Sequence, residues 1–395
     1  MHSGYATACC RECGEKIKKQ LALSMNNEVE EGCPASSNVR GAEYPRIHPD
    51  LRVTFRLEAL SAHTVQVQPG GDANGLGAGS FDMQCDAAGV WSVTTPPAVP
   101  GFHYYWLLVD GVAVNDPTSE TYFGYGRPTS GVEVPEPGVN FYDPQDVPHG
   151  EVRARWYRAQ TTGKWRRAYV YTPPGYDTAR DTRYPVLYLQ HGAGEDERGW
   201  TAQGRANFIL DNLIAAGGAA PMIVVMESGY AMEWKAGGPP GLEFLKQMGA
   251  AFEAMLLRDL IPMVDATYRT ITDREQRAIA GLSMGGFQAL QAGLTHLDTF
   301  AWIGAFSGAR LESSELQTAY NGVFSDPAAF NQQVRLLWLS AGTAEERFYQ
   351  GIQSLHAALE QIKIAHEIYV SQGTSHEWQT WRRSLHAFAP RLFRM

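Results

Sequence analysis

A serine at position 283 stands in a sequence context that could make it a nucleophile. The segment Gly281-Leu-Ser-Met-Gly285 has the spacing G-x-S-x-G; the apolar stretch Ala278-Ile-Ala280 precedes it, and a helix-like stretch, residues 287–292, follows it. In such a strand–turn–helix the glycines permit a tight turn that projects the serine hydroxyl beyond the sheet. A chain with 40 glycines forms the bare pattern readily by chance. The flanking strand and helix therefore favour a nucleophile over a structural turn.

A serine hydroxyl needs a base that takes its proton, so the sequence should supply a histidine. In hydrolases built around this turn, the histidine follows the serine along the chain. After Ser283, His376 is the histidine that lies in a loop, residues 373–378, directly behind an apolar strand at residues 366–370. Loops at the carboxyl ends of strands carry the functional groups of such sheets. We therefore predict that His376 is the general base.

A carboxylate should orient His376 and stabilise its imidazolium form. The expected place is the end of the preceding strand, where the sequence reads Gly342-Thr-Ala-Glu345-Glu346. Both carboxylates fit this place. We predict Glu345 as the triad acid and keep Glu346 as the alternative.

Two backbone N–H groups should face the oxyanion of the reaction. Met284 directly follows the nucleophile. Ala193 lies in the loop Gln190-His-Gly-Ala-Gly194, after an early apolar strand. We therefore predict that these two residues form the oxyanion hole.

Aromatic residues near the motifs are candidates for binding a planar acyl group by stacking. These predicted substrate-binding residues are Trp200, Tyr230, Trp234 and Trp378. Core packing beneath the loops explains each of them equally well.

From about residue 151 onward, apolar runs alternate with helical patterns. The runs are continuous, as in strands buried on both faces of a parallel sheet, and they span residues 184–190, 221–226, 277–280 and 334–340. Helical patterns lie between them at residues 205–216, 243–268, 286–295 and 349–362. This alternation predicts a doubly wound α/β domain over residues 151–395.

The first part of the chain reads differently. Residues 44–142 contain short stretches that alternate apolar and polar side chains, such as Leu51–Leu57, between glycine-rich turns, which predicts a small all-β sandwich of immunoglobulin type. A Pro- and Gly-rich stretch, residues 127–150, marks the boundary. Residues 1–43 are expected to be poorly structured. Their cysteines, Cys9, Cys10, Cys13 and Cys33, do not form two C-x-x-C pairs, which a metal site of this kind needs, so we predict no metal.

Composition excludes several classes of partner. The formal net charge of −9 argues against nucleic acid, which requires a basic face. The sequence contains no apolar run of about 18 residues, so we expect no membrane span. The N-terminus shows no readable signal peptide, which predicts a cytoplasmic protein; a gene-calling artefact there would leave a secreted or periplasmic protein. The oligomeric state is not defined by the sequence, and a homodimer is compatible with it.

Taken together, the motifs resemble the feruloyl esterase and esterase D group of α/β-hydrolases. The resemblance covers roughly residues 150–395 and rests on the segments 184–194, 259–262, 280–286 and 376–383. It assigns the nucleophile, the base and the oxyanion donors to the residues predicted above. Many members of the group carry Asp where this chain has Glu345. The preceding module is similar to the immunoglobulin-like domains found before many such esterases.

The resemblance implies a serine esterase without a cofactor, acting on a small-molecule or oligosaccharide ester. Its first expectation is a feruloyl esterase that releases hydroxycinnamic acids from plant cell-wall polysaccharide esters. Alternatives of the same class are an acetyl-xylan esterase and a siderophore esterase of the enterochelin type. An alternative of another class is a carbohydrate-binding protein with a degenerate hydrolase domain, which a missing triad member would favour.

Overall fold

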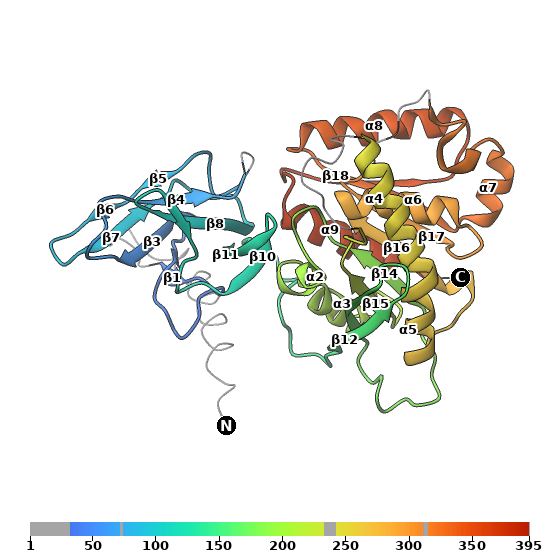
Figure 1. Ribbon diagram of the computed structural model, residues 1–395, viewed down its shortest axis with the longest axis horizontal. Coiled ribbons are helices and arrows are strands. Elements are labelled where there is room, and N and C mark those ends of the chain that lie inside the picture. The colour runs from blue at the N-terminus through green and yellow to red at the C-terminus, as the bar shows by residue number, and fades with distance from the viewer. Residues whose placement is uncertain (1–31, 72–73, 233–241, 310, 312–314, 395) are drawn as a thin grey trace. The chain divides into compact units, whose positions relative to one another are not determined.

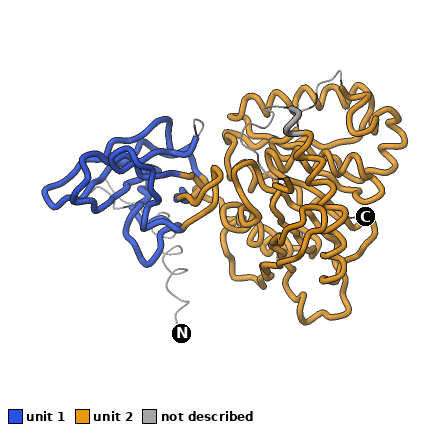
Figure 2. The backbone as a smooth tube through the Cα atoms, viewed as in Figure 1, with its two compact units in different colours: residues 1–100, 105–120, 130–134 blue, residues 101–104, 121–129, 135–395 orange. Residues whose placement is uncertain are grey.

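The computed structural model describes residues 32–71, 74–232, 242–309, 311 and 315–394. The chain divides into two compact units, each made of three stretches that alternate along the sequence (Figure 2). Unit 1 comprises residues 1–100, 105–120 and 130–134, and unit 2 comprises residues 101–104, 121–129 and 135–395. Unit 2 therefore includes two short segments that precede its main body in the sequence.

Two sheets contribute strands to unit 1. The first has the order β1-β2-β3-β7-β6, formed by Cys33–Pro34, Arg46–Ile47, Val53–Glu58, Val90–Thr94 and Gln84–Cys85. The second has the order β10-β11-β8-β4-β5, with β9 paired to β8, formed by Thr121–Gly124, Arg127–Val134, Gly101–Val109, Val65–Pro69, Phe81–Asp82 and, for β9, Val112–Val114. Phe55 of β3, Val67 of β4 and Tyr105 of β8 lie in one buried core. Side chains of both sheets therefore pack together in unit 1.

Part of the N-terminal segment is ordered. Residues 32–43, which the sequence predicts to be poorly structured, contain β1, and β1 pairs with β2 in the register Cys33↔Ile47. The N–H of Ala35 also donates to the carbonyl of Pro45 at 2.8 Å. Backbone pairing, which composition does not reveal, holds this stretch. Cys9, Cys10 and Cys13 lie outside the described residues.

Unit 2 is built on an eight-stranded sheet (Figure 1). Its order is β12-β13-β15-β14-β16-β17-β18-β19, formed by Glu151–Ala159, Lys164–Thr172, Ile223–Glu227, Val186–Gln190, Arg277–Leu282, Trp302–Phe306, Leu336–Gly342 and Glu367–Ser371. The hairpin β12–β13 is antiparallel, and β13 runs antiparallel to β15; the other neighbours are parallel. Every residue of β14, β15 and β17 is buried. The parallel strands therefore end together at one edge.

Helices cover both faces of this sheet. On one face, α3 (Ala206–Ala215) and α9 (Trp378–Phe388) contribute Ile209, Leu210 and Leu385 to a buried core. On the other face, a second core includes residues of α4 (Leu242–Met255), α5 (Ile261–Thr267), α6 (Met284–Thr295) and α8 (Glu346–Gln361). The shorter helices are α2 (Gly199–Ala202), η2 (Arg274–Gln276), η4 (Ala319–Gly322), α7 (Pro327–Gln333) and η5 (Ala389–Arg391). The predicted α/β architecture, with helices on both faces of a largely parallel sheet, is confirmed.

One predicted helix is interrupted. The helical pattern over residues 243–268 forms α4 and α5 with a π-helical turn, Leu256–Leu260, between them. Pro262 lies in the first turn of α5 and lacks the N–H that would bond the carbonyl of Arg258. The hydrogen-bond ladder therefore shifts at this point.

No helix in the described ranges is long and apolar enough to cross a membrane.

Candidate active site

Ser283 occupies a strained turn between β16 and α6. Its backbone has φ 50° and ψ −115°, a conformation that L-residues rarely adopt and that marks functional sites. The turn requires glycine on both sides of the serine: a Cβ on Gly281 would lie 2.5 Å from the backbone of Gly285, and a Cβ on Gly285 would lie 2.5 Å from the carbonyl oxygen of His191. The turn therefore holds the serine at the carboxyl edge of the sheet, as predicted for a nucleophile elbow.

Ser283, His376 and Glu345 form a continuous hydrogen-bond relay. The Ser283 hydroxyl lies 3.0 Å from Nε2 of His376, and Nδ1 of His376 lies 2.7 Å from Oε2 of Glu345. Since a carboxylate can only accept, Nδ1 carries the proton and Nε2 is left to accept from the serine. Three loops, after β16, β18 and β19, supply the residues. The arrangement can activate the serine for attack on a carbonyl carbon.

The carboxylate of Glu345 is held by two further donors. Oε1 accepts the Ser307 hydroxyl at 2.6 Å and the N–H of Gly342 at 2.5 Å. The indole N–H of Trp381 donates in turn to the Ser307 hydroxyl at 3.2 Å. Ser307 follows β17, a strand that the sequence analysis does not identify, so this residue was missed. The available signal was the apolar run Trp302–Phe306 followed by Ser-Gly.

Glu346, the alternative acid, lies apart from the relay. Its side chain is exposed and accepts a hydrogen bond from Gln350 of the same helix. The imidazole of His376 is instead fixed by two aromatic rings. Phe348 stacks on it, with ring centroids 4.3 Å apart and planes at 11°, and Trp381 meets it edge-on at 5.0 Å. Packing and hydrogen bonds together leave the base one orientation.

The loop after β14 lies against the nucleophile. A Cβ on Gly192 would lie 3.5 Å from the Cβ of Ser283. No hydrogen bond to another described residue uses the N–H of Ala193 or of Met284, the first residue of α6. Both N–H groups can thus donate hydrogen bonds to an oxyanion. The start of α6 adds favourable dipole charge at the same place.

Hydrogen bonds hold this oxyanion loop, residues 191–195, in place. The N–H of Gly194 donates to the Tyr230 hydroxyl at 2.6 Å, and the carbonyl of Gly194 accepts from the N–H of Gly126 at 2.7 Å. The N–H of Gly192 donates to Oε2 of Glu195 at 3.2 Å. Gly126 belongs to the segment 121–129, which is part of unit 2. Sequence reasoning placed that segment in the N-terminal module and so missed its role.

Glu195 is buried beneath the oxyanion loop. Its Oε1 accepts the Tyr104 hydroxyl at 3.1 Å, and that hydroxyl accepts from Gln203 at 2.6 Å and from the indole of Trp378 at 3.1 Å. Burial raises the pKa of Glu195 to about 8, although the bonds from Gly192 and Tyr104 oppose the shift. Burial therefore favours the neutral form of this carboxyl group.

His191 is a structural element of the loop. Its Nδ1 donates to the carbonyl of Gly192 at 2.7 Å, and its Nε2 accepts the N–H of Gly229 at 3.0 Å. Burial lowers the pKa of His191, so the ring stays neutral. The ring thereby ties the oxyanion loop to the loop after β15.

The aromatic residues predicted to bind substrate differ in exposure. Trp200 and Trp378 are each 1% exposed and meet edge-on in the core, so neither offers a ring face to a ligand in this structure. Their indole N–H groups are satisfied internally, that of Trp200 by the carbonyl of Gln190, which favours burial over exposure. Tyr230 is 39% exposed beside the oxyanion loop. Trp234 lies outside the described residues.

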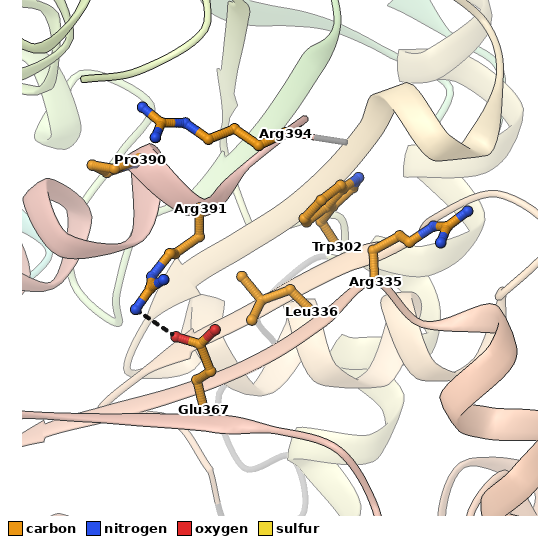
Figure 3. Close-up of a pocket in the computed structure, with 7 residues that line it drawn as sticks. All are labelled: Trp302, Arg335, Leu336, Glu367, Pro390, Arg391 and Arg394. Carbon is orange, nitrogen blue, oxygen red and sulfur yellow. Dashed lines mark ion pairs between the residues drawn. The ribbon is translucent and has the colours of Figure 1, made fainter. Parts of the chain in front are cut away.

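A separate pocket of about 300 Å³ lies at the opposite edge of the sheet (Figure 3). Trp302, Leu336 and Glu367 line it where β17, β18 and β19 begin, together with Arg335, Pro390, Arg391 and Arg394. Glu367 pairs with Arg391, which neutralises part of its charge. The pocket contains none of the relay residues.

Within the described part of the chain, no cluster of three or more His, Cys, Asp or Glu side chains could hold a metal ion.

The chain matches the family model described as "Putative esterase" over residues 159–392. It is 37% identical over 387 residues to a protein of Xylanibacter ruminicola named endo-1,4-beta-xylanase/feruloyl esterase; the match covers 96% of this chain and 50% of that protein. It is 33% identical over 165 residues to an esterase of Mycobacterium tuberculosis, covering 41% of this chain and 34% of that protein. The chain thus spans half or less of the length of these relatives.

Solved structures share the fold. A ferulic acid esterase of the anaerobic fungus Anaeromyces mucronatus aligns with a TM-score of 0.55 at 23% identity, over 65% of this chain and 96% of its own. The enterobactin esterase of Shigella flexneri aligns with a TM-score of 0.60 at 19% identity, over 86% of this chain and 92% of its own. The α/β-hydrolase-like fold is therefore common to all three proteins.

Proposed function

Since the chain belongs to the esterase family, we propose that it is a serine carboxylic-ester hydrolase, and within that class a feruloyl esterase that releases hydroxycinnamic acids from plant cell-wall polysaccharide esters. The observation that carries the proposal is the relay from Glu345 through His376 to Ser283. The 37% identity to a xylanase/feruloyl esterase over 96% of this chain supports the choice of substrate.

In the proposed reaction the Ser283 oxygen attacks the ester carbonyl carbon while Nε2 of His376 takes the hydroxyl proton. Glu345 stabilises the imidazolium that forms. The N–H groups of Ala193 and Met284 bind the oxyanion of the tetrahedral intermediate. When the intermediate collapses, the C–O bond to the alcohol breaks and His376 delivers its proton to the departing alkoxide. Water, deprotonated by His376, then attacks the acyl-enzyme and releases the free acid and Ser283.

Tyr230 is the described aromatic residue that we propose for the acyl pocket. Its hydroxyl accepts from Gly194 of the oxyanion loop, so its ring lies beside the site where the acyl group is bound. Trp234, which lies outside the described residues, stays a proposed substrate-binding residue. An aromatic ring beside the acyl group favours a planar aromatic acyl group over acetyl by about 1–3 kcal/mol.

The test compares kcat/KM for methyl ferulate and methyl acetate in wild type and in Ser283→Ala. We expect the ferulate ester to be preferred roughly ten- to two-hundredfold and the variant to be inactive on both esters. Equal or faster turnover of the acetate ester would refute the feruloyl assignment and favour an acetyl-xylan or general esterase. Activity in the Ser283→Ala variant within tenfold of wild type would refute the mechanism.

A siderophore esterase is the second candidate. The observation that favours it is the structural likeness to the enterobactin esterase, which extends over 86% of this chain and so beyond the hydrolase unit. The net charge of −9 opposes it, because ferric catecholate complexes are anionic. Hydrolysis of enterobactin faster than of methyl ferulate would decide for this candidate.

We also propose that residues 44–142 form an immunoglobulin-like domain and residues 151–395 the hydrolase domain. Two sheets that share the core residues Phe55, Val67 and Tyr105 support the first assignment. The complete relay weighs against a carbohydrate-binding protein with a degenerate hydrolase domain. Circular dichroism and cooperative unfolding of an expressed 32–142 fragment would test whether the first domain folds alone.

A further inference from the structure

Two tryptophans on the hairpin β12–β13 are open to solvent. Trp156 is 57% exposed and Trp165 is 65% exposed, whereas Trp200, Trp302, Trp338 and Trp378 are almost fully buried. An indole ring is among the largest apolar surfaces that a residue can bury, so leaving two neighbouring rings in water is unfavourable. Exposed apolar side chains that lie together mark binding surfaces.

The two rings share one face of the hairpin with two arginines. Trp156 pairs with Arg167, and Arg158 pairs with Trp165. Paired residues and residues two apart on a strand point to the same face, so all four side chains project together. The tryptophans are diagonal neighbours, whose Cα atoms lie ~7–8 Å apart in such a ladder. We call these four residues the aromatic platform.

The arginines complete the platform with hydrogen-bond donors. The Arg167 guanidinium lies 5.5 Å from the ring centroid of Trp156 and is held from below by an ion pair with Glu197 at 2.6 Å. Arg158 is exposed and forms no ion pair with another described residue. Flat apolar rings therefore alternate with positively charged donors across the pair of strands.

The platform lies at the catalytic edge of the sheet. In the pairing of β13 with β15, Ala168 lies opposite Glu227, the last residue of β15. Residues 164–167 therefore lie at the carboxyl ends of the parallel strands. Ser283 and His376 lie at the same edge of the sheet. Arg166 also donates to the carbonyls of Ser228 and Tyr230, in the loop that anchors the oxyanion loop.

This chemistry fits a sugar chain. The C–H face of a pyranose ring stacks on an indole, and its hydroxyls accept hydrogen bonds from a guanidinium. The ester that the site is proposed to cleave joins an acyl group to a glycan, so the rest of the glycan needs a surface outside the catalytic relay. A protein partner would need a larger continuous surface than two rings and two arginines offer.

We propose that the aromatic platform is a subsite for the glycan chain of a polymeric ester, with sugar rings stacked on Trp156 and Trp165. The inference rests on the proposed esterase function and adds the part of the substrate that the catalytic relay does not contact. The hairpin β12–β13 would then bind substrate in addition to completing the sheet.

The kinetic test uses the full chain with Trp156→Ala, Trp165→Ala and the double variant. Substrates are methyl ferulate, which has no glycan, and feruloylated arabinoxylan. We expect kcat/KM on the polymer to fall roughly two- to twelvefold for each tryptophan, mainly through KM, because an aromatic stacking contact is lost. Turnover of methyl ferulate should stay within about twofold. Val152→Ala, which alters another exposed apolar residue of β12, is the matched control and should change neither value.

The binding test does not depend on turnover. Titration of ester-free arabinoxylan into Ser283→Ala should give measurable affinity, which the added double tryptophan change should abolish and Trp→Phe changes at both sites should largely restore. If wild type cleaves neither ester, the proposed function fails while this titration still decides the subsite. Unchanged arabinoxylan affinity and polymer kcat/KM in a double variant with wild-type circular dichroism would overturn the proposal. A dimer in wild type that becomes a monomer in the double variant, with glycan affinity unchanged, would also overturn it and assign the platform to a second copy.

Discussion

Replacement of Glu345 by glutamine tests the relay most directly. Three donors converge on the carboxylate: Gly342 N–H and the Ser307 hydroxyl on Oε1, and His376 Nδ1 on Oε2. The amide has the same shape but one accepting oxygen and one donating NH₂. If the amide NH₂ takes the place of Oε2, the N–H of His376 loses its acceptor. If the NH₂ takes the place of Oε1, the N–H of Gly342 and the Ser307 hydroxyl both lose theirs.

The two orientations have different costs. If the NH₂ faces His376, the imidazole must switch its proton to Nε2, and the ring can no longer accept from Ser283. If the oxygen faces His376, the N–H of Gly342 stays buried without an acceptor, which costs about 1–3 kcal/mol and reduces the competent fraction roughly 5- to 150-fold. Loss of the negative charge beside the imidazolium adds to this penalty. We therefore expect kcat to fall by about 10² to 10⁴.

The measurement is kcat for methyl ferulate at saturating substrate, with thermal unfolding as the check that the variant folds. Glu346→Gln is the matched control, because Glu346 is the exposed neighbour outside the relay, and its kcat should stay within about twofold of wild type. A loss of less than tenfold in Glu345→Gln, or a larger loss in Glu346→Gln, would refute the assignment of the acid.

Three further expectations follow from the same geometry. Ser283→Ala should reduce ester turnover by at least about 10³-fold with an unchanged melting temperature, since one hydroxyl at the surface of the site is lost. Ser307→Ala removes a donor to Glu345 and the acceptor of the Trp381 indole; unfolding in urea should show a loss of about 1–3 kcal/mol, and a variant as stable as wild type would contradict the bond pattern. Glu195→Gln tests the raised pKa of about 8. Because the folded protein keeps a proton that the unfolded chain releases above its ordinary pKa near 4.5, stability due to Glu195 is fully present below pH 4.5 and is lost as pH rises toward 8. The melting temperature of wild type should thus fall relative to Glu195→Gln between pH 5 and 8, and parallel curves would show that Glu195 is ionised in the folded state.

The relay could be predicted from the sequence because its members are constrained locally. Ser283 sits in a glycine-rich turn, and Glu345 and His376 each follow an apolar strand by a few residues. In a parallel sheet all such positions reach the same edge. Three local sequence patterns therefore predicted that these residues lie at the same edge of the sheet, although none of their contacts was known.

The surroundings of the relay could not be predicted in the same way. Nearness in sequence placed Trp200 and Trp378 in the pocket, yet the direction of a side chain depends on the helix that carries it, and both rings lie in the core. Ser307 comes from β17, whose neighbours in the sheet are set by pairing over long sequence separations. Tyr104 and Gly126 reach the hydrolase unit from segments whose local pattern is that of the β module.

The contribution of these early segments affects where the chain can be divided without loss of the catalytic site. The residues that hold the oxyanion loop and the buried Glu195 include Gly126 and Tyr104, which precede the main body of unit 2 in the sequence. A recombination event at the Pro- and Gly-rich boundary would transfer the relay without these supports. A hydrolase fragment that begins at residue 135 would therefore lack two of the residues that hold the oxyanion loop and Glu195, and we expect it to keep the relay residues but to lose turnover.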